Sequence, residues 1–157
     1  MTTVSIQEGE VAPGFTAITD GNKKLKLTSL KGKIIVLYFY PKDDTPGCTR
    51  ESCEFASKFN QFKKKNAQIF GVSRDSVDRH DKFKAKYSLP FNLISDENGK
   101  ICNIYDTWKE KKNYGRVYMG IERTTYLIDQ DLIVRRIWRK VKVNGHVDEV
   151  LNAVKSL

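Results

Sequence analysis

The sequence predicts a single-domain α/β fold, because a buried strand is followed by an amphipathic helix and the same order then recurs. The run Ile34–Tyr40 is apolar without a break and rich in β-branched and aromatic residues, which is typical of a strand buried on both faces. From about Gly47 the spacing becomes helical, and four side chains share one stripe: Cys48, Phe55, Phe59 and Phe62. At 157 residues the chain can bury one full core, so we expect one domain over residues 1–157.

The first 65 residues contain a lead-in, a central strand and a long helix. Within the lead-in, residues 1–33, two short strands flank a turn at Asp20-Gly21-Asn22. Pro41 ends the strand at 34–40, because proline offers no N–H to a neighbouring strand. The expected elements are strands at Thr16–Thr19, Lys24–Leu27 and 34–40, and a helix from about 47 to 65.

The rest of the chain alternates strands and helices and closes with a hairpin and a terminal helix. Asp75 or Ser76 is suited to cap the second helix, and Leu89-Pro90 ends it. The segment Trp108–Tyr118 is basic and is predicted to be an irregular loop. The other expected elements are a strand at Ala67–Ser73, a strand at Phe91–Ile94, a short helix around Ile101–Tyr105, strands at Arg123–Asp129 and Leu132–Arg139, and a helix that Asn144-Gly145 opens.

The composition is that of a protein without a membrane span. No apolar run approaches the roughly 20 residues that a membrane-spanning helix needs. The N-terminus lacks both the basic segment and the long apolar segment of a secretory signal. We therefore expect a cytoplasmic protein that does not bind a membrane.

The strong positive charge raises the alternative of a basic nucleic-acid-binding module. The net charge is +9 and the pI about 9.4, and lysines alternate with aromatic residues in Trp108–Tyr118. Elsewhere the lysines are spread along the chain, with one short run at Lys63–Lys65, and no nucleic-acid-binding motif accompanies them. We therefore expect no specific nucleic-acid partner, and at most a weak, salt-sensitive affinity for polyanions.

The three cysteines indicate redox or catalytic use, since an intracellular chain seldom has a disulfide framework. Four residues separate Cys48 from Cys53, and no second ligand pair accompanies them, so a metal site is not expected. Cys102 lies on an apolar stripe and is most simply a core residue, with a second resolving thiol as the alternative. His80 is expected at the surface or at its boundary rather than as a catalytic base.

Cys48 is the candidate reactive residue, because it falls in the first turn of a helix that follows a central strand. Unpaired backbone N–H groups and a partial positive charge at a helix N-terminus both stabilise a thiolate, the reactive form of cysteine. The hydroxyl of Thr45, three residues earlier, can turn toward the sulfur. The alternative is a small, inert core cysteine, which would need neither this approach nor a second cysteine five residues later.

These residues resemble a known family of thiol peroxidases. Pro41, Thr45 and Cys48 match the Pro-x-x-x-Thr/Ser-x-x-Cys signature of peroxiredoxins. The longer string Thr-Pro-Gly-Cys-Thr followed by Cys53 resembles the atypical two-cysteine subgroup known as bacterioferritin comigratory protein or peroxiredoxin Q. The resemblance extends nearly end to end, through the segments Ala12–Phe15, Gly71–Ser76 and Tyr118–Asp129.

The resemblance implies a thioredoxin-like fold and a role for each residue of the motif. It implies that Cys48 attacks a peroxide and becomes a sulfenic acid, and that Cys53 resolves it as an intramolecular disulfide. It assigns the activating cation to Arg123, while Thr45 donates a hydrogen bond and Pro41 shields the thiolate. It also implies hydrogen peroxide or organic hydroperoxides as substrates, thioredoxin or a similar dithiol as the reductant, no cofactor, and a monomer or weak dimer.

A thioredoxin-like disulfide oxidoreductase is the alternative enzyme class. Such proteins normally contain Cys-x-x-Cys, which the spacing of Cys48 and Cys53 does not fit. In the peroxidase interpretation, the aromatic and basic segment Trp108–Tyr118 covers the back of the active-site crevice or contacts the reductant.

Overall fold

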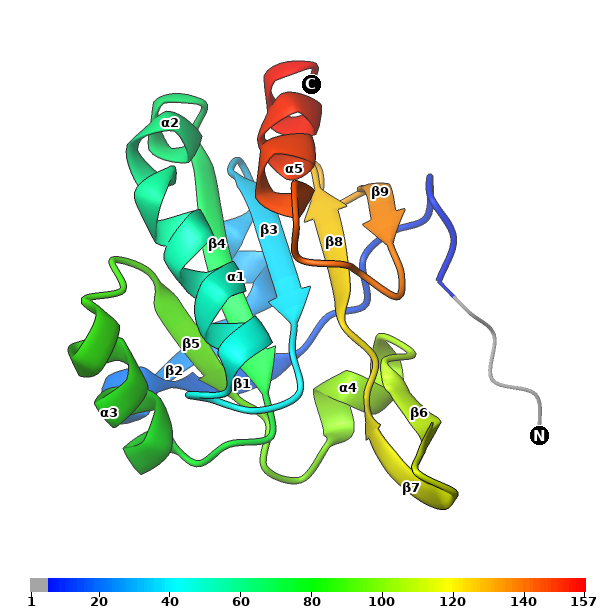
Figure 1. The fold of residues 1–157 in the computed structure, drawn as a ribbon. Coiled ribbons are helices and arrows are strands. Elements are labelled where there is room, and N and C mark those ends of the chain that lie inside the picture. The colour runs from blue at the N-terminus through cyan, green and yellow to red at the C-terminus, as the bar shows by residue number, and fades with distance from the viewer. Residues whose placement is uncertain (1–5) are drawn as a thin grey trace.

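A seven-stranded mixed sheet forms the centre of the computed structural model, which describes residues 6–157 (Figure 1). The first five residues of the expected domain lie outside the described residues. The strand order is β2-β1-β5-β4-β3-β8-β9, with β3, β4 and β5 parallel and the other pairings antiparallel. The strands are β1 (Thr16–Thr19), β2 (Lys23–Lys26), β3 (Ile34–Phe39), β4 (Ala67–Ser73), β5 (Asn92–Ser95), β8 (Thr124–Ile128) and β9 (Val134–Trp138).

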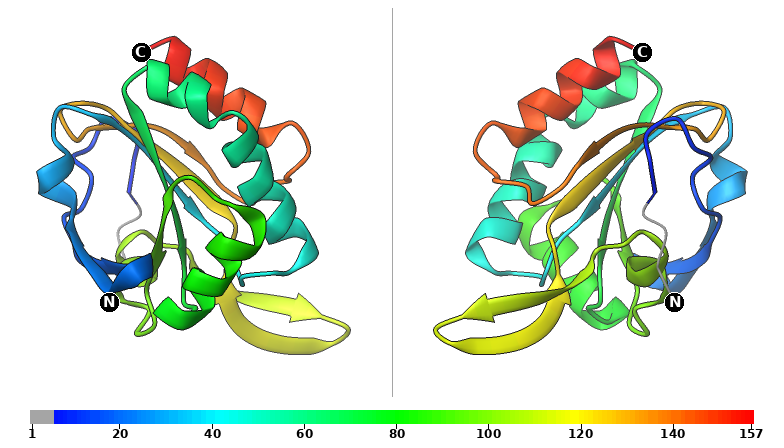
Figure 2. Two further views of the ribbon diagram at one scale, coloured as in Figure 1. Left: turned by 90° about the vertical axis from the view of Figure 1, so that its left-hand side faces the viewer. Right: turned by 90° about the vertical axis from the view of Figure 1, so that its right-hand side faces the viewer.

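Helices cover both faces of this sheet, as the hydrophobic patterns predict (Figures 1 and 2). One face carries α1, α2, α3 and α5, and the other carries α4 together with the N-terminal segment. The helices are α1 (Pro46–Ser57), α2 (Phe59–Lys64), α3 (Val77–Tyr87), α4 (Lys100–Ile104) and α5 (His146–Lys155), with short 3₁₀ turns η1 (Asp20–Asn22) and η2 (Leu27–Leu30). None of the helices in residues 6–157 has the length and apolar character needed to cross a bilayer.

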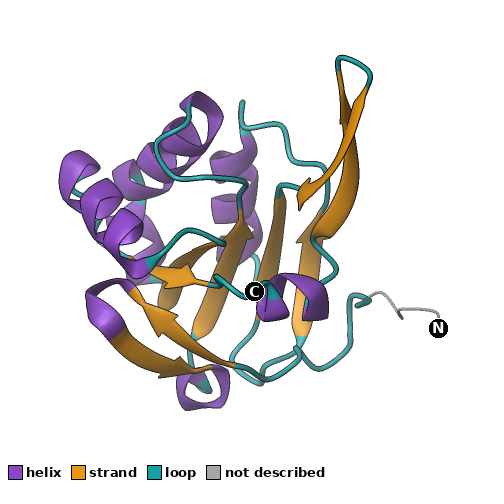
Figure 3. Ribbon diagram, turned by 90° about the horizontal axis from the view of Figure 1, so that it is seen from below, coloured by secondary structure: helices purple, strands orange, loops and turns teal. Residues whose placement is uncertain are grey.

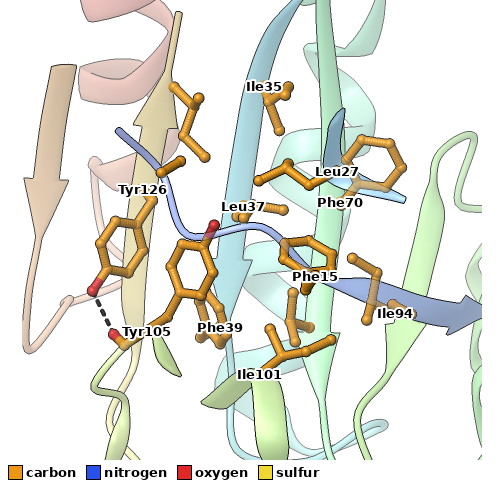
Figure 4. Close-up of a cluster of buried hydrophobic side chains, with 14 of the residues drawn as sticks. Phe15, Leu27, Ile35, Leu37, Phe39, Phe70, Ile94, Ile101, Tyr105 and Tyr126 are labelled. Atoms are coloured by element: carbon orange, nitrogen blue, oxygen red, sulfur yellow. Dashed lines mark hydrogen bonds between the residues drawn. The ribbon is translucent and has the colours of Figure 1, made fainter. Parts of the chain in front are cut away.

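The central strand β3 divides the hydrophobic core into two layers, because its side chains alternate between the two faces. All six of its residues are buried. Ile35, Leu37 and Phe39 pack in the layer that also holds Tyr105 and Tyr126, and Figure 4 shows this layer. Val36 and Tyr38 face the opposite layer, which holds the buried side chains of α1, α2, α3 and α5: Cys48, Phe55, Phe62, Phe83, Val147, Val150, Leu151 and Val154.

Two of the expected elements differ from the structure. The helix expected over about 47–65 is interrupted at Lys58, whose backbone (φ −102°, ψ 5°) separates α1 from α2. The expected irregular loop Trp108–Tyr118 is instead most of an antiparallel hairpin, β6 (Trp108–Asn113) with β7 (Arg116–Ile121). We call this hairpin the arm, and it projects from the body of the molecule in each of the views in Figures 1, 2 and 3.

Candidate active site

Cys48 lies in the first turn of α1, next to the end of the central strand. Residues 40–45 connect β3 to α1, so the sulfur lies near the carboxyl ends of the parallel strands, where α/β sheets commonly bind ligands. The side chain is 2% exposed and its thiol is free. Pro46 occupies the first helical position, where its missing N–H costs nothing. The prediction of a cysteine at a helix N-terminus is confirmed.

Arg123 connects this sulfur to a second side chain of α1. Its Nη2 donates to Cys48 Sγ at 3.4 Å, and its Nη1 donates to Glu51 Oε1 at 2.7 Å. Arg123 follows β7 and immediately precedes β8, which pairs with β3, so the sheet carries the guanidinium to α1. Gly47 permits the close approach, since a Cβ there would lie 3.2 Å from Nη2. The structure therefore brings together the two residues that the sequence and the resemblance singled out.

Glu51 is a functional candidate that the sequence interpretation missed. Its carboxylate is fully buried, and Oε2 has no hydrogen-bond partner among the described residues. Burial raises the pKa of Glu51 to about 7, although the Arg123 guanidinium partly offsets this effect. A signal existed in the sequence: Glu51 lies three residues after Cys48 and four before Phe55, which places a charge on the buried stripe of the helix.

Thr45 and Pro41 lie in the expected loop but do not make the expected contacts. Thr45 is the N-cap residue of α1, and its hydroxyl donates to the carbonyl of Lys42 at 2.8 Å rather than to the sulfur. Pro41 is exposed, so shielding of Cys48 by its ring is not visible in this conformation. The backbone explains part of the position of Thr45, since its carbonyl accepts from Thr49 N and begins the helix.

The loop before α1 is fixed to α3 by two consecutive aspartates. Asp43 accepts hydrogen bonds from the Tyr40 hydroxyl at 2.6 Å and from Nδ1 of His80 at 2.6 Å. Asp44, at a left-handed φ of 59°, accepts from Lys86 at 2.8 Å and from Tyr87 at 2.7 Å. These bonds hold the loop that leads to Cys48, which limits how the start of α1 can move.

His80 is fully buried, so the expectation of a surface or boundary residue was wrong. Its Nε2 lies 2.9 Å from the carbonyl oxygen of Ile94, which can only accept, and its Nδ1 faces Asp43. Both ring nitrogens therefore carry hydrogens, as in an imidazolium. Burial lowers the pKa of His80, but the hydrogen bond and charge of Asp43 outweigh burial and leave that pKa raised.

The two other cysteines occupy different surroundings. Cys53 also belongs to α1 and is partly exposed, and burial raises the pKa of its thiol. Cys102 is fully buried in the core layer on the opposite face of the sheet from Cys48, which confirms it as a core residue. Burial first, and then the charge of Asp96, raise its pKa far above the usual range. The sheet therefore separates Cys102 from the sulfur at the N-terminus of α1.

One cluster in residues 6–157 has the composition of a metal site. Asp43, Asp75 and His80 place their ligand atoms within 4.8 Å of one another. Those atoms already form hydrogen bonds with one another and with neighbouring groups of the chain. Asp75 Oδ2 accepts from Asp43 N at 2.8 Å and from the hydroxyl of Ser73 at 2.6 Å. Asp75 Oδ1 accepts from Arg79 at 3.0 Å. The cluster is therefore explained as a buried hydrogen-bond network that anchors the loop.

Several known proteins are similar to this chain in sequence. Residues 9–137 match the AhpC/TSA family. A relative from Coxiella burnetii, named putative peroxiredoxin bcp, is 49% identical over 148 residues, which cover 94% of this chain and 98% of the relative. Peroxiredoxin Bcp of Bacillus subtilis is 48% identical over 154 residues, which cover 98% of both chains.

A solved structure shows the same fold. It is the bacterioferritin comigratory protein of Xanthomonas campestris, studied for alkyl peroxide reduction with trapped intermediate and ligand complexes. It superposes with a TM-score of 0.87 at 44% identity and covers 90% of each chain. The expected thioredoxin-like fold is thereby confirmed. The chain belongs to the AhpC/TSA family, in the group of bacterioferritin comigratory proteins also called peroxiredoxin Q, and is a thiol peroxidase.

Proposed function

We propose that Cys48 is the residue that attacks the peroxide. Its thiolate forms a bond to one oxygen of ROOH while the O–O bond breaks, which leaves a sulfenic acid on Cys48 and an alkoxide RO⁻. The alkoxide takes up a proton and leaves as ROH. Hydrogen peroxide and organic hydroperoxides are the substrates, and the leaving product is water or an alcohol.

The fork of Arg123 between Cys48 and Glu51 is the observation that carries this assignment. One Nη group donates to the sulfur, while the other is held by a buried carboxylate that fixes the plane of the guanidinium. A planar guanidinium can direct hydrogen bonds to two acceptors at once, which a lysine cannot do in this way. Such a donor supports both the thiolate and the negative charge that develops on the leaving oxygen.

Cys53 resolves the sulfenic acid in the second step. Its thiol forms the S–S bond to Cys48 and displaces the hydroxyl, which leaves as water. A dithiol protein of the thioredoxin type then reduces the disulfide and becomes oxidised itself. The raised pKa of Cys53 keeps its thiol protonated and less reactive toward peroxide. We place this cycle in a single cytoplasmic domain, residues 1–157, that acts as a monomer or weak dimer in antioxidant defence.

Thioredoxin-coupled consumption of peroxide by the purified chain tests the assignment. We expect the protein to turn over with hydrogen peroxide and thioredoxin, and we expect Cys48→Ser to abolish turnover. Cys102→Ser is the matched control, since it removes a buried thiol on the far face of the sheet and leaves the proposed cycle intact. Near-normal turnover by Cys48→Ser would refute the role of Cys48, while reduction of insulin disulfides without peroxide turnover would favour an oxidoreductase.

A further inference from the structure

The arm places three lysines of one strand in different surroundings. In β6, Lys109 pairs with Asp106 at 2.8 Å, and Lys112 is exposed. Lys111 is half-buried and forms no hydrogen bond or ion pair with the residues that the structure describes. Lys111 and Lys112 are neighbours in a strand, so they point to opposite faces of the arm. Lys111 is therefore a cation that the fold partly desolvates and that forms no ion pair within residues 6–157, although the charge of Glu122 acts on it.

The backbone of the opposite strand makes room for Lys111. A Cβ at Gly120 would lie 3.3 Å from Lys111 Cδ and 3.5 Å from Cε, so the lysine stem crosses the strand directly over this glycine. Gly120 has no left-handed φ, and a glycine within a strand is unfavourable unless something approaches it closely. The register pairs Lys111 with Tyr118 and Lys109 with Gly120, so the stem leans toward the base of the arm. The base leads within two residues to Arg123.

Negative charge exceeds positive charge at the active site, with Lys111 left out, once Glu51 is ionised. Its pKa of about 7 means that above this pH the Cys48 thiolate and the Glu51 carboxylate face the single positive charge of Arg123. Burial and the charge of Arg123 lower the pKa of Lys111, while the charge of Cys48 opposes that change, so Lys111 senses both groups. The other groups that face these charges are Tyr38 on β3, Glu54 on α1, Glu122 beside Arg123, and His146 on α5.

We propose that Lys111 is the second cation of the active site, and that its charge supports the thiolate and the leaving oxygen without touching either. The proposal rests on the proposed attack by Cys48. During the attack one negative charge moves from sulfur to the leaving oxygen, so a nearby fixed cation stabilises the reactive form and the product of the step. Lys111 is thus an electrostatic supporting residue, and Arg123 remains the residue that contacts the sulfur.

The test compares Lys111→Gln with Lys112→Gln, a control that removes the same charge one residue away on the opposite face. Stopped-flow oxidation of Cys48 by hydrogen peroxide is measured from pH 5 to 9, together with alkylation of Cys48 by the neutral reagent iodoacetamide. We expect Lys111→Gln to be slower by at least about threefold near pH 6, with its rate profile moved to higher pH. Lys112→Gln should follow the wild type, and Lys111→Arg should restore most of the rate.

Salt separates a charge effect from a change in structure. High salt should reduce the difference between wild type and Lys111→Gln, because screening weakens the field of a partly exposed cation. Superimposable profiles for wild type and Lys111→Gln, or equal losses in both Gln variants, would overturn the proposal. Cys48→Ser is run in parallel: turnover by that variant refutes the proposed function itself, whereas an inactive Cys48→Ser beside an unchanged Lys111→Gln refutes only the role of Lys111.

Discussion

Glu51 and Arg123 form an ion pair of 2.7 Å, and within residues 6–157 the fully buried carboxylate uses only one of its two oxygens. The ion pair therefore does not fully offset the cost of burying the carboxylate, since that cost is offset only when all its hydrogen bonds are satisfied. Its value lies in where it holds the guanidinium, whose other Nη group reaches Cys48 at 3.4 Å.

Arg123→Ala should slow the oxidation of Cys48 by peroxide more than tenfold. The reason is the loss of a charged hydrogen bond at the sulfur, worth about 1.5–3 kcal/mol. The rate is measured by stopped-flow with hydrogen peroxide. The substitution also leaves the buried Glu51 carboxylate without its cation, so we expect a lower free energy of unfolding as well.

The double variant Arg123→Ala/Glu51→Gln separates these two effects. It removes the unpaired charge, so its stability should recover relative to Arg123→Ala, while peroxide oxidation stays slow. A double variant whose rate recovers together with its stability would show that Arg123 acts only by supporting the fold.

Glu51→Gln should change how stability depends on pH. The pKa of Glu51 is raised in the folded protein to about 7 from an ordinary value of 4.5, so the neutral form is favoured by folding. Its contribution is fully present below about pH 4.5 and is lost as the pH rises toward 7, by an amount on the order of 3 kcal/mol. Urea unfolding at several pH values should show that, between about pH 4.5 and 7, the free energy of unfolding falls more in the wild type than in Glu51→Gln. A constant difference between the two proteins would contradict the prediction.

His80→Gln should weaken the fold most at lower pH. The pKa of His80 is raised above 6.5 in the folded state, so the imidazolium stabilises the protein below that pH and this contribution is lost as the pH rises through the folded value. The stability gap between wild type and variant should therefore shrink from pH 6 toward alkaline pH.

His146→Gln is the control, because the stability contributed by His146 should change with pH in the opposite direction to that of His80. Burial lowers the pKa of His146 to about 4, and its Nε2 hydrogen-bonds the hydroxyl of Thr125. The contribution of neutral His146 is present above about pH 6.5 and is lost as the pH falls toward 4. If both variants show the same pH slope, the assigned charge state of His80 is wrong.

Hydrophobic periodicity predicted most elements of the fold, because buried strands and amphipathic helices leave direct patterns in the chain. The arm was missed for the converse reason. Its two strands carry exposed and charged side chains on both faces, so the alternation that identifies a half-buried strand is absent between Trp108 and Ile121. The break at Lys58 was missed because neither proline nor glycine marks it.

The candidate site could be predicted from the residues only where its chemistry is local in the sequence. Cys48 was proposed from the strand and helix that flank it, whereas the proposal of Arg123 depended on the resemblance to a family. The pairing of Asp43 with His80 joins residues 37 positions apart and exists only once α3 packs on the sheet. Of the residues that the sequence interpretation missed, only Glu51 could have been recognised from the sequence, as a charge on an otherwise buried helical stripe.

We expect α1 to open in each catalytic cycle. Cys48 and Cys53 both belong to this helix, and five residues of helix separate their Cα atoms by a rise of about 7.5 Å. A disulfide needs Cα atoms roughly 4.4–6.8 Å apart, so the helix must unwind locally before the bond forms. Oxidation with one equivalent of peroxide should therefore lower the helix content and raise amide exchange across residues 47–55.

A buried hydrogen bond opposes this opening and offers a way to adjust it. The hydroxyls of Tyr38 on β3 and Ser52 on α1 are 2.8 Å apart, and the ring of Tyr38 stacks on Phe55 at 4.7 Å. Unwinding α1 removes Ser52 and leaves the buried Tyr38 hydroxyl without its partner, which costs about 1–3 kcal/mol. Tyr38→Phe keeps the ring and removes the hydroxyl, so we expect faster disulfide formation and less sulfinic acid at high peroxide.

Cys53→Ser should do the opposite and leave Cys48 as sulfenic acid, prone to overoxidation. Peptide mapping of the oxidised protein decides the matter: a bond from Cys48 to Cys102, or between two chains, with Cys53 still free, would overturn this mechanism and leave only the peroxidase activity standing.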